Sequence, residues 1–216
     1  NPLLEPFRAN QVDVTAEWYF GGNDFISATA YYKDLDTFIT TATQIIDIGG
    51  VNYEFFQPVN GKGGYIRGLE MTYQHQFNSL PAPFDGLGVY ANYALTDSDI
   101  TVSRNYSAAT LGLNGLSKSV GTGSVNFVGR GFEARFSYRY RGGFARVVDG
   151  GGFENDESEG FLDFQTSYEF KKGVSVVLQA ANLTNTPYRT NLGDKGLHGR
   201  YEEFGRMYYL GFRARF

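Results

Sequence analysis

The chain contains no cysteine, which excludes a disulfide framework and a thiolate metal site. It also lacks any run of about 18 apolar residues, so no transmembrane helix is expected. The formal net charge of -4 offers little attraction to phosphates, and no nucleic-acid partner is expected. The opening Asn1-Pro2-Leu3-Leu4-Glu5 has neither a basic segment nor an apolar core, so it does not resemble a signal peptide.

Glycine and aromatic residues, in contrast, are abundant. The 216 residues include 28 Gly, 19 Phe and 16 Tyr, yet the mean hydropathy is only -0.32. Strands with one apolar face and one polar face produce this combination, because polar residues on one face offset aromatic residues on the other.

Apolar and polar residues alternate along most of the chain. Over residues 132–141, the apolar set is Phe132, Ala134, Phe136, Tyr138 and Tyr140, and the polar set is Glu133, Arg135, Ser137, Arg139 and Arg141. A period of two predicts β-strands. We expect an all-β chain of nine antiparallel strands: 11–20, 25–34, 65–77, 87–96, 120–128, 132–141, 161–170, 174–182 and 204–216.

The connections between these strands alternate in length. Four are short, at 21–24, 78–86, 129–131 and 171–173, and four are long, at 35–64, 97–118, 142–160 and 183–203. Strands of about ten residues with short turns at one end and long loops at the other are typical of a transmembrane β-barrel. A soluble sandwich or lipocalin-like barrel is the alternative, but its interior would hold apolar side chains rather than Arg135, Arg139 and Arg141.

The C-terminal strand ends in an aromatic residue. Its residues Tyr209, Gly211, Phe212, Ala214 and Phe216 are similar to the signal that the barrel-assembly machinery reads in outer-membrane proteins. The remainder of the chain resembles the C-terminal part of a TonB-dependent outer-membrane receptor. The matching pieces are Asn1-Pro2-x-Leu4-x-Pro6, Asn10-Gln11-x-Asp13, Glu17-Trp18-Tyr19-Phe20, Tyr32-Lys33-Asp34-Leu35-Asp36-x-Phe38-Ile39, Arg67-Gly68-Leu69-Glu70, Gly115-Leu116-Ser117-Lys118 and Asn182-Leu183-Thr184-Asn185-x-Pro187-Tyr188.

This resemblance implies a barrel of about 22 strands around an N-terminal plug. Nine strands form only part of such a wall, so we expect residues 1–216 to be its C-terminal portion. The plug and the earlier strands then lie outside this chain. The resemblance further implies a bacterial outer-membrane location with a periplasmic C-terminus. The implied partners are lipid and lipopolysaccharide, the TonB–ExbB–ExbD complex acting through the plug, the barrel-assembly machinery, and a small-molecule or oligosaccharide ligand.

Candidate ligand-binding residues lie in the first long connection and on the polar face. Tyr53, Phe55, Phe56 and Gln57 adjoin a glycine-rich stretch and suit a flexible binding loop, although packing of one loop against another is the alternative. Arg139 and Arg141 could guide an anionic ligand, although pairing with acidic neighbours explains them as well. We expect no metal or cofactor: His75 is predicted at an outward interfacial position and His198 in a loop. The acidic run 154–159 could hold Ca²⁺, but a solvated loop is the simpler interpretation.

The resulting hypothesis is active, TonB-energised uptake of a scarce nutrient. Saccharides are the first expectation for the ligand, and siderophores or other metal chelates the second. A passive porin-like channel is the alternative in a second class. An outer-membrane enzyme is not expected, because no nucleophile–base motif is present.

Overall fold

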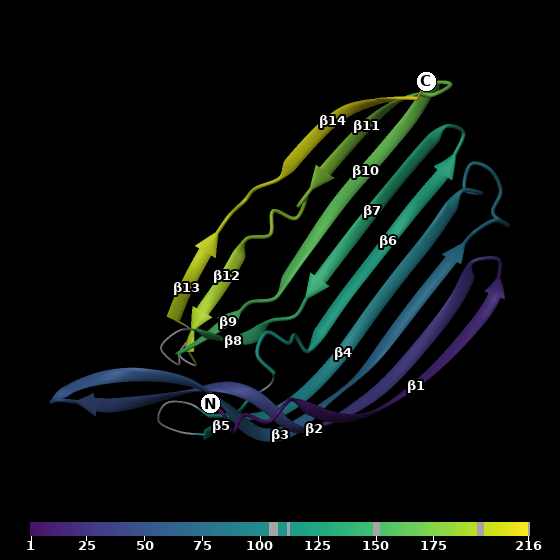
Figure 1. Ribbon diagram of the computed structural model, residues 1–216. Helices are drawn as coiled ribbons and strands as arrows, with labels where there is room; N and C mark the ends of the chain where they lie inside the picture. Colours follow the sequence, from purple (N-terminus) through teal and green to yellow (C-terminus); the bar gives the residue numbers. More distant parts are fainter. Residues whose placement is uncertain (104–107, 112, 149–151, 194–196, 216) are drawn as a thin grey trace.

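The computed structural model describes residues 1–103, 108–111, 113–148, 152–193 and 197–215. Nine strands follow one another in an antiparallel sheet, each hydrogen-bonded to the next along the chain (Figure 1). They are β1 (Arg8–Gly21), β2 (Asp24–Ile48), β3 (Val51–Gln76), β4 (Leu87–Ser103), β6 (Ser119–Gly129), β7 (Phe132–Arg141), β10 (Glu159–Lys171), β11 (Val174–Ala181) and β14 (Met207–Ala214). Each of the nine predicted strands has a counterpart in this sheet, in the predicted order.

The four long connections differ from the prediction because they contain further strands. β2 and β3 continue through residues 35–64 as one long hairpin. β5 (Ala108–Leu111) pairs with an extended β4. β8 (Phe144–Val148), β9 (Gly152–Asp156), β12 (Tyr188–Leu192) and β13 (Leu197–Glu202) form a second sheet in the order β13-β12-β9-β8. Backbone groups thus find partners at this end too, which residue composition alone did not indicate.

Each strand of the main sheet has one apolar face and one polar face. Cross-strand register places Leu69, Leu95 and Tyr93 on the same face, and this apolar face continues through Phe136, Phe164 and Leu178 to Leu210. The other face carries Glu70, Asn92, Arg139, Asp163 and Gln179, among others. The alternation predicted from sequence is therefore maintained across all nine strands.

Most of the apolar surface faces away from the protein. Among the described residues, the buried hydrophobic side chains are Leu35, Phe38, Ile100 and Ala180, whereas Leu210 and Phe212 are 70% and 77% exposed. The accessible surface is 14396 Å², against about 9,900 Å² for a soluble monomer of this mass. The apolar face is thus largely uncovered by other parts of the described chain.

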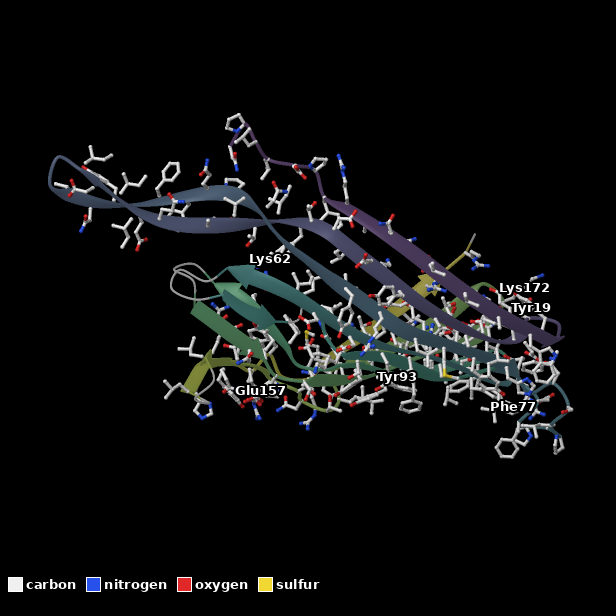
Figure 2. All side chains as sticks on the ribbon, turned by 90° about the horizontal axis from the view of Figure 1, so that it is seen from below. Tyr19, Lys62, Phe77, Tyr93, Glu157 and Lys172 are labelled. Atoms are coloured by element: carbon white, nitrogen blue, oxygen red, sulfur yellow. The ribbon has the colours of Figure 1, made fainter. Side chains whose placement is uncertain are left out.

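The two ends of the main sheet differ in construction. Short turns close the β1–β2, β3–β4, β6–β7 and β10–β11 connections at the end that holds the C-terminus (Figure 1). Tyr19, Phe77 and Lys172 mark this end in Figure 2, while Lys62 and Glu157 lie toward the opposite end. The N-terminus lies at that opposite end, as an odd number of antiparallel strands requires. We call them the short-turn end and the long-connection end.

A tyrosine–glycine contact crosses three strands of the polar face. Tyr31, Gly68 and Thr96 are direct cross-strand neighbours, and the Tyr31 hydroxyl lies over Gly68 to meet Thr96 Oγ1 at 3.0 Å. A Cβ atom at Gly68 would stand 2.4 Å from the Tyr31 hydroxyl and 2.6 Å from the Leu95 carbonyl oxygen. The Arg-Gly-Leu-Glu motif therefore needs glycine for close packing.

Replacing Gly68 by alanine should destabilise the sheet by about 1–3 kcal/mol, because the added methyl overpacks the contact between Tyr31 and β4. Gly123→Ala is the matched control, since no atom lies within 4 Å of a Cβ at that position in β6. Urea unfolding of the full-length protein in lipid vesicles measures both. An equal effect of the two substitutions would refute the packing role of Gly68.

Candidate functional site

The longest projection from the sheet is the hairpin formed by β2 and β3. Their register is unbroken from the Phe25–Gln74 pair to the Ile48–Val51 pair. Gly49 and Gly50 both have positive φ, at 66° and 86°, as a two-residue hairpin turn requires. The hairpin extends well beyond the main sheet (Figures 1 and 2). It is therefore a regular extension of the wall and not a loose loop.

The predicted aromatic ligand residues lie on this hairpin, but they do not share one surface. All four belong to β3, where successive side chains point to opposite faces. Tyr53 pairs with Ile46, and Phe55 and Gln57 lie on the same face. Phe56 lies on the other face. Tyr53, Phe55 and Phe56 are exposed, and Gln57 is half-buried. The structure thus separates Phe56 from the other three.

The glycines beside these aromatics do not provide a flexible loop, so that interpretation is wrong. Gly61, Gly63 and Gly64 all lie within β3. A Cβ at Gly61 would come within 2.6 Å of the Phe38 ring, and one at Gly64 within 2.1 Å of the Asp99 carbonyl oxygen. Their role is close packing where the hairpin leaves the sheet, above the buried cluster of Leu35, Phe38 and Ile100.

The N-terminal segment fastens the same hairpin. Asn60 and Glu5 exchange two hydrogen bonds of 2.8 Å, from the Glu5 amide to Asn60 Oδ1 and from Asn60 Nδ2 to the Glu5 carbonyl. Asn1 Nδ2 donates to the Pro58 carbonyl at 3.0 Å. Of the Asn-Pro-x-Leu-x-Pro motif, Asn1 thus has a hydrogen-bond partner on the hairpin.

The three arginines of β7 lie on the polar face, as predicted, but have different partners. Arg139 forms an ion pair with Asp163 at 3.1 Å. Arg135 Nη2 donates to Ser124 Oγ at 3.3 Å. Arg141 donates to Ser117 Oγ and to the Gly115 carbonyl, at 2.9 and 2.8 Å. Pairing with carboxylates thus accounts for one arginine, and Arg141 instead holds the Gly-Leu-Ser-Lys motif in place.

A concavity of about 430 Å³ lies on the polar face between β7 and β14. Its polar lining is Thr122, Arg135, Ser137, Arg139, Asp163, Gln165, Gln179 and Tyr209. Guanidinium, amide and hydroxyl donors dominate this lining, and Asp163 is its single carboxylate. Such a surface suits an oxygen-rich or anionic molecule.

An ion-pair network ties the second sheet together. Arg146 Nη2 donates to Glu154 Oε2 at 2.8 Å and to the Tyr188 hydroxyl at 2.9 Å. The Tyr188 hydroxyl donates to Asp156 Oδ1 at 2.7 Å. The hydrogen bond to Tyr188 and the charge of Asp156 raise the pKa of Arg146. Burial and the bond to Asp156 raise the pKa of Tyr188, which stays a neutral donor.

The acidic run 154–159 therefore lies mainly in strands β9 and β10 and meets cations of the chain itself. Arg189 approaches Glu157 at 4.0 Å in addition. Within the described part of the chain, no group of three or more His, Asp or Glu side chains could hold a metal ion. Of the carboxylates in this run, Glu154, Asp156 and Glu157 thus have arginine partners within the chain.

The motif that begins at Asn182 forms a turn around the buried side chain of Asn182. Asn182 has a φ of 54°, and its Oδ1 accepts the Thr186 amide at 2.9 Å while its Nδ2 donates to the Gly205 carbonyl at 3.1 Å. Its amide donates to Asp163 Oδ1 at 2.9 Å. The turn thus connects the main sheet to β12, where the Tyr188 hydroxyl lies within hydrogen-bond distance of Arg146. The motif signals this turn in sequence, whereas nothing marks Arg146 as its partner.

The two histidines have separate environments. His75 contacts the rings of Phe20, Tyr73 and Phe77 on the apolar face near the short-turn end, as predicted, and lies 3.0 Å from Asp24 Oδ2. His198 lies in β13 and not in a loop. The assembly-signal residues Tyr209, Gly211, Phe212 and Ala214 belong to β14, while Phe216 lies outside the described residues. Their signal role stays a prediction.

The described residues include no helix long and apolar enough to cross a membrane, a finding that concerns helical spans alone. The sequence model of the TonB dependent receptor-like, beta-barrel family matches residues 1–183. No curated relative matches the chain.

Solved structures share the fold. One is the siderophore receptor PiuA from Acinetobacter baumannii, with a TM-score of 0.67 and 16% identity, over 95% of this chain and 28% of that one. Another is a mutant of the ferric enterobactin receptor PfeA from Pseudomonas aeruginosa in complex with enterobactin, with a TM-score of 0.66 and 18% identity, over 99% and 32%. The chain thus spans about a third of their length.

Removal of Arg146 should loosen the second sheet. In Arg146→Gln, the carboxylates of Glu154 and Asp156 lose their cation. We expect a loss of roughly 2–3 kcal/mol, below the 3–5 of a fully buried pair because Arg146 is partly exposed. Amide hydrogen exchange of β8, β9 and β12 in the full-length protein measures this loss of stability.

Arg200→Gln is the matched control, because its pair with Glu202 is exposed and 3.7 Å long. It should change the same protection by less than about 0.5 kcal/mol. Unchanged exchange of β9 in Arg146→Gln would contradict a stabilising role of the network.

Proposed function

Because the chain belongs to the TonB-dependent receptor-like β-barrel family, we propose that it is part of the wall of an outer-membrane receptor. In this role the apolar face contacts lipid and the polar face lines the lumen. The short-turn end, which holds the C-terminus, is periplasmic, and the long-connection end is extracellular. The whole receptor takes up a scarce nutrient with energy delivered through TonB.

The observation that carries this proposal is the pairing of all nine strands in chain order, with one face apolar throughout. Lipid offers no hydrogen-bond partner, so only a closed barrel satisfies the two outer edges, β1 and β14. Residues 1–216 are then one portion of that barrel, with the plug and other strands contributed by the remainder of the receptor. A passive porin-like channel is the weaker alternative, because the family comprises energised receptors.

We favour a ferric siderophore over a saccharide as the ligand class. The saccharide expectation comes from the resemblance of two short motifs, Glu17-Trp18-Tyr19-Phe20 and Tyr32-Lys33-Asp34-Leu35-Asp36, which lie within strands β1 and β2 of the wall. The solved structures of the same fold include a siderophore receptor and a receptor in complex with enterobactin. The donor-rich concavity around Arg135 and Arg139 suits the oxygen-rich, anionic surface of a ferric catecholate.

Ligand contacts are proposed at two places, on the β2–β3 hairpin and on the lumenal face of the main sheet. On the hairpin, Phe56 is exposed on the face that continues the lumenal side of β3, whereas Tyr53, Phe55 and Gln57 continue the face of Leu69. On the lumenal wall, Arg139 is the better candidate of the two predicted arginines, since its side chain is 61% exposed. Arg141 also lines the lumenal side, where its bonds to residues 115 and 117 position the neighbouring segment.

Uptake by the full-length receptor should require TonB. In cells lacking other iron receptors, we expect accumulation of radiolabelled ferric enterobactin with TonB present and at least a tenfold lower rate in its absence. Labelled maltohexaose should not accumulate under either condition. Uptake that continues without TonB would identify a passive channel, and TonB-dependent uptake of maltohexaose alone would restore the saccharide assignment.

The hairpin contacts can be tested by paired substitutions on its two faces. Loss of the ring in Phe56→Ala should weaken binding of ferric enterobactin to the full-length receptor about fivefold, since an aromatic contact contributes about 0.5–1.5 kcal/mol. The double variant Tyr53→Ala with Phe55→Ala, on the opposite face, is the control and should bind within about twofold of the unmodified receptor. Fluorescence quenching titration measures the affinity of both variants. A reversed order of effects would move the contact to the face of Tyr53 and Phe55.

A further inference from the structure

Positive charge is concentrated on one half of the short-turn end. The β6–β7 turn contributes Arg130, the β10–β11 turn Lys171 and Lys172, and the end of β14 Arg213 and Arg215. The turns of the other half, residues 20–26 and 76–88, contain no lysine or arginine and carry Asp24 and Asp85. The cationic segments lie together because β6, β7, β10, β11 and β14 are successive neighbours in the main sheet.

The three cationic segments are fixed side by side. The Glu169 amide donates to the Gly131 carbonyl at 2.8 Å, and the Arg215 amide donates to the Gly173 carbonyl at 2.8 Å. All five cationic side chains are exposed. Within the part of the chain that the structure describes, none of them forms an ion pair with a carboxylate.

A concavity of about 740 Å³ lies between these segments. Arg130, Lys172, Arg213 and Arg215 line it, together with Glu133 and Glu169 on the polar face. Arg213 and Arg215 lie on the same face as the two glutamates, whereas Arg130, Lys171 and Lys172 lie at the tips of the two turns.

The apolar face next to these tips is aromatic. Phe132, Tyr168, Phe170 and Phe212 are exposed there. An irregularity in the register sets Lys171 opposite Val174, whose partner on β14 is Ala214. Lys171 therefore stands at the border of the apolar face. Cations beside a band of aromatic rings match the boundary between phosphate groups and acyl chains.

We propose that Arg130, Lys171 and Lys172 bind the phosphate of an anionic phospholipid in the leaflet at the short-turn end. This inference rests on the proposed membrane location, and it is independent of ligand and TonB. The acyl chains lie against the aromatic rings while the phosphate meets the turn tips. An acidic polypeptide fits less well, because it would approach from the polar face, where Glu133 and Glu169 repel it.

Native mass spectrometry of the full-length receptor, released from nanodiscs of equal phosphatidylglycerol and phosphatidylcholine, tests the site. The unmodified protein should retain phosphatidylglycerol preferentially. The triple variant Arg130→Gln, Lys171→Gln and Lys172→Gln should lose at least tenfold of that preference, because each cation near an anionic surface contributes about fivefold. A heat-dependent shift in gel mobility verifies folding, and the pair Lys171→Gln with Lys172→Gln replaces the triple variant if that shift is absent.

The control removes three charges at the long-connection end, by Arg8→Gln, Lys62→Gln and Arg189→Gln, and should leave the preference intact. An equal loss in this control, or no preference in the unmodified protein, overturns the site. Displacement of the lipid by millimolar inorganic phosphate or by polyglutamate would instead assign the cations to a free anion or an acidic chain. A preference for lipopolysaccharide over phosphatidylglycerol would place them in the other leaflet. Each of these results is independent of whether the receptor transports an iron chelate.

Discussion

The backbone hydrogen bonds between successive strands are the interaction on which the rest of the structure depends. In lipid, an unpaired amide or carbonyl has no alternative partner, so every residue of the wall must pair with a neighbouring strand. Antiparallel pairing in chain order satisfies this requirement with the shortest connections. The pairing in turn fixes which side chains share a face, and the apolar and polar faces follow from it. Burial in a core plays little part, since Leu35, Phe38 and Ile100 form the main buried cluster among the described residues.

Many of the residues that carry the family resemblance hold the long-connection end in shape. Asn182 caps the turn between the two sheets, and Arg141 fixes the Gly-Leu-Ser-Lys segment. Leu35 and Phe38 close the base of the hairpin, and Gly68 receives Tyr31. These residues therefore have structural roles within the described chain.

The sequence was sufficient to predict the strands of the wall. It was insufficient to predict the structure of the segments that extend from the wall at the long-connection end. Strict alternation, as in residues 132–141, identifies a strand and its faces because the period of two is a property of the chain alone. The hairpin beyond Leu35 was misjudged for a physical reason. Its glycines and polar residues read as a loop, while in the structure Gly61 and Gly64 make room for Phe38 and the β4 backbone. The separation of Phe56 from Tyr53 and Phe55 follows only once that segment is known to be a strand. The partnership of Arg146 with Tyr188 joins residues 42 positions apart, which no local pattern reports.

The unbroken register of β2 and β3 makes the hairpin and the wall a single mechanical element. The same two strands run from the turn beside Asp24 to the tip at Gly49 and Gly50 in one register, with residues paired along their length except at Asp36 and Gly63. A force applied at the tip is therefore transmitted along the hydrogen-bonded strands into the sheet. There the hydrogen bond from Tyr31 across Gly68 to Thr96 connects β2 to β4. Bending of the hairpin tip therefore also strains the paired strands of the wall.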